Sequence, residues 1–184
     1  MLGTKFYKGK YKQIDYTMAS IWCNENGCGI VDKGEYYEVV EIPTPSLEEL
    51  KTAKLAEVDT WTANKITGGF VSTCYNGESI LYDTDTETQL TMTKARANCE
   101  GERFKIAFPE GMGVRGYAQT GADEDGTLVF ADTKTIFNFR PEHIIAWDED
   151  FSLHLAQCKY EGWVMQAMVN NAKSIEELEA IVLD

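Results

Sequence analysis

Several features that mark enzymes and membrane proteins are scarce in this chain of 184 residues. It has only two histidines, His143 and His154, and four prolines. No apolar run approaches the ~20 residues needed to span a bilayer. The first sixteen residues mix polar, basic and aromatic side chains, unlike a secretory signal peptide. We therefore expect no membrane contact and a cytoplasmic site of synthesis.

Cysteine is present, but in an odd number. The five cysteines stand at irregular spacing, which argues against a secreted disulfide framework and for mostly reduced thiols. Cys23 and Cys28 form a close pair, but a structural zinc site needs a second pair of ligands that the sequence does not offer. We expect these two cysteines to pack in the fold. A disulfide between them is an alternative only in an oxidising environment.

Basic residues are outnumbered by acidic ones. Seventeen Lys and Arg against thirty Asp and Glu give a formal net charge of -13. Such a surface repels phosphate backbones, so we expect no direct binding of nucleic acid. The charge is typical of a component kept soluble for assembly. Two alternatives are steering toward a basic partner and imitation of DNA toward a basic protein.

Motifs for nucleophilic or cofactor chemistry are also missing. The sequence has no Gly-x-Ser-x-Gly turn, no phosphate-binding glycine loop and no dinucleotide fingerprint. Nothing in the sequence ties either histidine to a cysteine. We predict a protein that is not an enzyme and that holds no metal and no cofactor. A pocket gathering His143 or His154 with a carboxylate and a cysteine would argue the opposite.

Asp83, Asp85 and Glu87 imitate the start of a calcium-binding loop. The imitation fails because Thr88 stands where the loop needs glycine and Lys94 where it needs the closing glutamate. Carboxylates at a helix start are stabilised by the positive end of the helix dipole. We therefore predict that they cap a helix.

What is present is a globular composition, 43% hydrophobic, with patterns that predict an α+β fold of two parts. The first part is a small βαββ module, residues 1–43, that ends at Pro43. Asp15 is the expected N-cap of its helix, residues 16–26, and Gly27 the expected left-handed residue that closes it. The apolar face of this helix is expected to be Met18, Ile21 and Trp22. Strands are expected at residues 5–7, 10–13, 29–31 and 36–42.

The second part, residues 44–184, is expected to hold helices packed with antiparallel hairpins. Its strongest local signal is Asn76-Gly77, typical of a tight hairpin turn. Helices are expected at 46–64, after 83–87, for about 29 residues from Pro141, and after the capping residue Ser174. Strands are expected at 70–75, 79–82 and 103–108, and at 128–130 paired with 135–139, with loop over most of 101–126.

The long helix from Pro141 carries apolar residues at spacings of three and four, here called the seam. One interpretation is the core of this domain, packed against the helix at 46–64; the other is a coiled-coil surface that joins copies. We favour the first. The seam consists of Ile144, Trp147, Phe151, Leu155, Cys158, Gly162, Met165 and Val169.

The second part also resembles a known family. The stretches KLAEVDTWTANKITGGFVST, YDTDTETQLTMTKA and LHLAQCKYEGWVMQAMVNNAKSIEELEAI occur in the order found in a domain of unknown function from phage tail and tail-fibre genes. This resemblance covers about residues 47–183, although residues 100–127 match nothing in it. The stretch MASIWCNENGCGIVDKGEYYEVVEIP resembles N-terminal modules of short phage proteins encoded near tail fibres, including fibre-assembly chaperones.

The resemblance implies a structural protein of a phage or prophage tail that contacts other tail or fibre proteins, or further copies of itself. It would be made in the host cytoplasm and reside in the virion tail. One alternative is a chaperone that assembles the fibre; another is an acidic inhibitor of a host nucleic-acid enzyme. The candidate partner-binding residues are Trp22, Trp147, Phe151, Trp163 and Met165.

Overall fold

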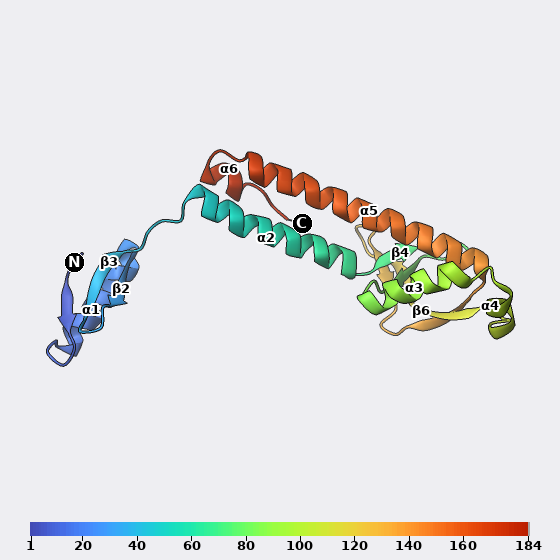
Figure 1. Ribbon diagram of the computed structural model, residues 1–184, viewed down its shortest axis with the longest axis horizontal. Helices are drawn as coiled ribbons and strands as arrows, with labels where there is room; N and C mark the ends of the chain where they lie inside the picture. The colour runs from blue at the N-terminus through green and yellow to red at the C-terminus, as the bar shows by residue number, and fades with distance from the viewer. Residues whose placement is uncertain (184) are drawn as a thin grey trace. The chain divides into compact units, whose positions relative to one another are not determined.

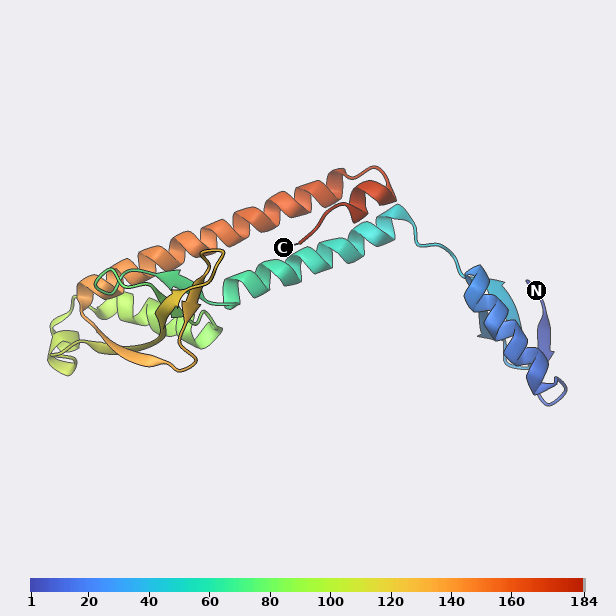
Figure 2. The same ribbon diagram turned by 180° about the vertical axis from the view of Figure 1, so that it is seen from behind.

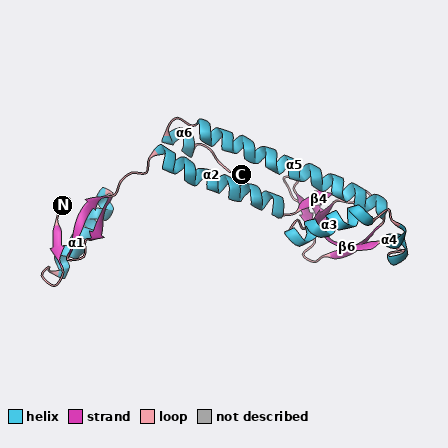
Figure 3. Cartoon of the chain, viewed as in Figure 1, coloured by secondary structure: helices cyan, strands magenta, loops and turns pink. Residues whose placement is uncertain are grey.

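The computed structural model describes residues 1–183 and divides the chain into two compact units, Met1–Ser46 and Leu47–Asp184. The chain combines helices with sheets whose strand pairs are all antiparallel, which confirms the α+β class (Figure 3). Residues 42–46 form no regular element and connect the units, and the predicted boundary after residue 43 lies inside this connection. No helix among residues 1–183 combines the length and the apolar character that crossing a membrane requires.

The first unit consists of one helix and a three-stranded antiparallel sheet of order β1-β3-β2. The predicted strand at 10–13 is wrong: the Lys10 N–H donates to the Tyr7 carbonyl in a turn, and the helix follows at once. Lys12, not Asp15, is the N-cap, and Gly27 at φ 63° closes the helix as predicted. The elements are β1 Lys5–Tyr7, α1 Gln13–Asn26, β2 Cys28–Asp32 and β3 Tyr36–Glu41.

The second unit is organised around two long helices that lie side by side, α2 Leu47–Thr67 and α5 Pro141–Asn171 (Figures 1 and 2). The short helix α6 Ile175–Glu179 packs at one end of this pair. Ser174 caps α6 as predicted, since its hydroxyl accepts from the Glu177 N–H. The seam of α5 faces the interior of this unit, which confirms that it is core.

A five-stranded antiparallel sheet lies at the other end of the pair. Its longest strand, β6, falls in the region predicted as loop, so that prediction is wrong. The predicted pairing of the last two strands is also wrong, because each pairs instead with its own part of β6. The hairpin around Asn76-Gly77 is confirmed, since β4 pairs with β5 and both residues have positive φ, but the predicted tight turn is wrong, because residues 73–79 form a longer loop. The strands are β4 Phe70–Ser72, β5 Ile80–Tyr82, β6 Met112–Ala122, β7 Leu128–Phe130 and β8 Thr135–Phe139.

Two further helices, α3 Thr86–Asn98 and α4 Glu102–Ala107, complete the second unit. The predicted strand at 103–108 is wrong. Phe104 and Phe108 stand four residues apart, and their rings lie 4.9 Å from each other across one helical turn. Residues four apart are neighbours on one side of a helix. In an extended strand the same two residues would lie roughly 13 Å apart, and their rings would not meet.

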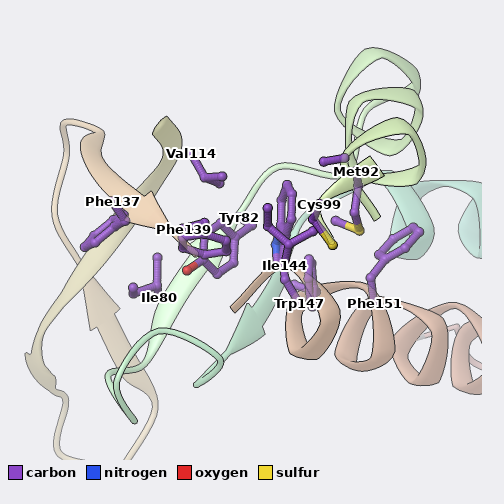
Figure 4. Packing of buried hydrophobic residues seen from close by; sticks show 12 residues of the cluster. Ile80, Tyr82, Met92, Cys99, Val114, Phe137, Phe139, Ile144, Trp147 and Phe151 are labelled. Atoms are coloured by element: carbon purple, nitrogen blue, oxygen red, sulfur yellow. The ribbon is translucent and has the colours of Figure 1, made fainter. Parts of the chain in front are cut away.

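The main core of the second unit forms where α5 crosses the sheet and meets α3 (Figure 4). Aromatic rings dominate it: the ring centroid of Trp147 lies 5.5 Å from those of Tyr82 and Phe139, with the Phe139 ring edge-to-face and the Tyr82 ring tilted. Met92 and Cys99 bring α3 onto the same cluster. A second, smaller cluster around Val58 and Val169 joins α2, α5 and α6 at the far end.

Candidate partner-binding surfaces

The structure separates the five predicted partner-binding residues. Trp147 is 2% exposed and Phe151 is 8% exposed, so both belong to the core and neither can meet a partner. Their apolar character holds the fold together, and their assignment as contact residues is wrong for that reason. Trp22 and Met165 are half-buried and pack against the cores of their own units. Trp163 is 64% exposed and remains free to bind.

Helix α1 turns a different face to its sheet from the one expected. Ala19 and Cys23 are the buried residues of the helix, because their small side chains let the backbone approach the sheet closely. The predicted inner residues Met18 and Ile21 are therefore outside, 56% and 54% exposed, and Ile14 is exposed beside them. These three residues recur at i, i+4 and i+7, on one side of the helix. We call them the α1 face.

Helix α5 carries a second exposed apolar row that the seam pattern did not reveal. Its members stand at spacings of three and four, displaced from the seam by half a turn, so they lie on the opposite side of the helix. Tyr160 and Trp163 are the largest of them. We call this row the outer stripe; it consists of Leu153, Ala156, Tyr160, Trp163, Val164, Ala167 and Met168.

The charge of the chain is divided unequally between the units. Residues 1–46 carry five basic and six acidic side chains, whereas residues 47–184 carry twelve and twenty-four. The α1 face therefore belongs to a nearly neutral unit and the outer stripe to a strongly acidic one. The second unit experiences most of the self-repulsion that a net negative charge produces.

His154, Cys158 and Glu161 lie close together on α5. A histidine, a cysteine and a carboxylate are the combination that would argue for a catalytic site. The Cys158 Sγ lies 3.6 Å from the His154 Nε2. Burial raises the pKa of the Cys158 thiol, which keeps it protonated and weakly nucleophilic. The His154 Nε2 also lies 3.2 Å from the Lys65 carbonyl, and Glu161 accepts from the Lys65 Nζ at 2.7 Å.

The two contacts with Lys65 have a structural effect, since they join α5 to the last turns of α2, whereas the contact between Cys158 and His154 lies within α5. The Lys65 ammonium also lies 4.5 Å from the Trp61 ring, a cation–π contact within α2. Lys65 and Glu161 line a shallow pocket with Trp61, but neither Cys158 nor His154 is among the residues that line it. The cluster supports packing of the two helices.

Of the three carboxylates after β5, Asp85 has the capping role that the sequence predicts, and Glu87 lies in the first turn of α3. Asp85 is the N-cap of α3, and its side chain accepts from the Glu87 and Thr88 N–H groups. These bonds lower the pKa of Asp85. Asp83 instead pairs with Lys134 from the turn before β8. Across residues 1–183 no three His, Cys, Asp or Glu side chains gather in a way that would hold a metal ion.

Comparison of this sequence and structure with family models, with curated proteins and with solved structures found no match. The α1 face and the outer stripe are the features from which a function can be argued, because each is an exposed apolar surface on one side of a helix.

Proposed function

We propose that this chain is a structural protein of a phage or prophage tail, and that it acts by binding other tail or fibre proteins and catalyses no reaction. The α1 face carries the proposal. Three large apolar side chains, more than half exposed, stand on one side of a helix whose opposite side is fully packed. Exposure of such a row to water is unfavourable, and binding of a protein partner would bury these side chains.

The composition of the first unit supports an apolar contact. α1 has two charged residues: Asp15 lies beside the row formed by Ile14, Met18 and Ile21, and Glu25 stands one turn after Ile21, at the end of the same row. A partner would therefore meet aliphatic side chains in the centre and polar groups at the rim, the usual anatomy of a protein interface. The fitting partner is an apolar patch or helix on a tail or fibre protein.

The assignment to a phage tail is supported by the resemblance of residues 47–183 to the tail-associated domain. The order of a long helix, a hairpin after Gly68-Gly69, a capped helix and a second long helix is the order of that family. The protein would reside in the virion tail after its synthesis in the host cytoplasm. Contact between proteins would be its whole activity.

Mass spectrometry of purified virions tests the proposal. We expect the chain in the particles at a fixed ratio to the other tail proteins. A Met18→Asp variant should be depleted from particles, because it places a charge in the α1 face. Leu90→Asp is the matched control, since Leu90 on α3 is 53% exposed and lies outside the face. Normal tails that contain none of the chain would refute the structural role.

A fibre-assembly chaperone is the second candidate, favoured by the division of charge. A neutral unit with an apolar face could hold an unassembled fibre while the acidic unit keeps the complex in solution. Co-expression distinguishes this role: a chaperone raises the yield of soluble fibre and is then missing from finished virions. Met18→Asp should abolish that gain in yield, and Leu90→Asp should not.

A further inference from the structure

The outer stripe of α5 points to a second interaction, distinct from the α1 face. Its positions Leu153, Ala156, Tyr160, Trp163 and Ala167 alternate at spacings of three and four over two heptads, which is the pattern of a helix that packs against another helix. The seam already satisfies the fold on the opposite side of α5. The stripe is therefore surplus to the packing of the second unit.

The local absence of charge limits what can cover the stripe. From Phe151 to Asn171 the chain has two charged residues besides a histidine, Lys159 and Glu161, although 26% of the whole chain is charged. Glu161 is already paired with Lys65. The one exposed acidic residue in line with the stripe is Glu149, a turn before the stripe begins, so the net charge of the protein offers a basic partner little along the stripe itself. An apolar helix without charges fits best.

A second copy of this chain supplies such a helix. Two molecules with a strongly negative charge repel each other over most of their surface, and the outer stripe is a place where they can approach without placing like charges in contact. A two-fold axis would set each stripe against the other, because the same patch then serves both partners. Ala156 and Ala167 leave room beside the large rings of Tyr160 and Trp163.

The exposed area is also sufficient for such a pair. Tyr160 is 61% and Trp163 is 64% exposed, and Leu153 is 70% exposed. With about 150–250 Å² in each aromatic side chain and the aliphatic side chains beside them, the stripe offers on the order of 500 Å² per copy. Two copies together reach the roughly 1,000 Å² that a specific interface needs. We propose that the chain forms a symmetric homodimer through the outer stripe of α5.

Sedimentation of the full chain from low to high micromolar concentration tests this proposal. We expect a monomer–dimer equilibrium in the wild type. Trp163→Glu should raise the dimer dissociation constant by roughly 30-fold or more, as loss of a central aromatic residue does at other interfaces. Ile106→Glu is the matched control, because Ile106 on α4 is 72% exposed and lies outside the stripe. It should dimerise like the wild type.

A second variant guards against damage to the fold. Leu153→Lys lies at the other end of the stripe, and it should weaken the dimer in the same direction while near-ultraviolet circular dichroism and the unfolding temperature stay as in the control. A wild type that remains monomeric at every concentration would overturn the proposal. So would a dimer that both stripe variants leave unchanged. The virion experiments on the α1 face do not depend on either result.

Discussion

At the scale of single residues, a glycine sets how closely β6 approaches β5. A Cβ at Gly116 would lie 2.6 Å from the Ile80 Cγ2 and 3.0 Å from the Tyr82 Cε1, both in the buried core. We expect Gly116→Ala to destabilise the protein by about 1–3 kcal/mol through overpacking. Gly121→Ala in the same strand has open space around it and should change stability by less than about 0.5 kcal/mol. Urea unfolding measures both, and equal effects would contradict the packing argument.

Asp85 at the start of α3 gives stability a dependence on pH. The Thr88 backbone N–H, the Thr88 hydroxyl and the Glu87 N–H donate to its carboxylate and lower its pKa in the folded protein. This stabilisation is complete above the unfolded pKa, about 3.9, and is lost as the pH falls through the lower folded pKa. Asn caps helices as well but does not titrate in this range.

We therefore expect Asp85→Asn to be nearly as stable as the wild type at pH 7 and to lose less stability below about pH 4. Unfolding temperatures recorded across this range give the comparison. Asp132→Asn, in an exposed turn of the same unit, controls for the general effect of removing one carboxylate. If both variants follow the same pH curve, the cap is not the cause.

The candidate binding residues show what a spacing pattern can and cannot predict. Trp147 and Phe151 stand in a row of apolar residues. Such a row predicts that one face of the helix is buried, but it does not show whether the same chain or a partner buries that face. In this protein other elements of the second unit bury it. Trp163 lies outside that row. Its exposure depends on which side of α5 packs against α2, and a local sequence pattern does not predict that packing. For α1 the predicted inner face proved to be exposed. The small side chains of Ala19 and Cys23, which pack against the sheet, carry little hydrophobic signal in the sequence.

At the scale of whole elements, local signals predicted those helices that begin and end with distinct capping residues. Gly27 closes α1, Asp85 begins α3 and Ser174 begins α6. Strand β6 was missed because its sequence holds three glycines, which lower the propensity for a strand. Its conformation is fixed by pairing with β5, β7 and β8. Such pairing joins residues far apart in the chain, which a local reading does not detect.

Helices α2 and α5 approach each other closely at Gly162. A Cβ there would lie 2.4 Å from the Thr62 Oγ1 and 3.0 Å from its Cγ2, and the Thr62 hydroxyl donates to the Val58 carbonyl. Alanine favours a helix over glycine by about 1 kcal/mol, but overpacking costs about 1–3 kcal/mol. We expect the overpacking to dominate because threonine is branched at Cβ and cannot turn away freely.

Gly162→Ala should therefore lower stability, and Gly162→Ala combined with Thr62→Ala should recover most of the loss. Thermal or urea unfolding of the two single variants and the double variant forms a cycle that isolates the contact. Additive losses would show that Gly162 and Thr62 do not limit the approach of the two helices.

At the scale of the whole molecule, the sequence indicated two parts, and the structure places the connection between them at residues 42–46. The first unit has a small core built around Phe6, Cys23 and Val39. Units of this size bury a modest share of their surface and are marginally stable alone.

We expect two transitions on heating, with the first unit melting at the lower temperature. Calorimetry measures both, and Trp22→Phe removes the one tryptophan of the first unit, so fluorescence assigns the transitions.

Salt should act on the two units differently. The second unit has twelve basic and twenty-four acidic residues, so its carboxylates repel one another in the compact state, whereas the first unit is nearly neutral. Raising the ionic strength from about 0.01 M to 0.15 M shortens the screening length from about 30 Å to about 8 Å and weakens that repulsion. Ion pairs such as Lys65–Glu161 weaken as well, but exposed pairs contribute only about 0–1 kcal/mol each. The acidic excess therefore dominates, and the transition of the second unit should rise by a few degrees while that of the first unit moves less. Equal shifts in both transitions would indicate a general effect of salt on protein surfaces instead of relief of charge repulsion.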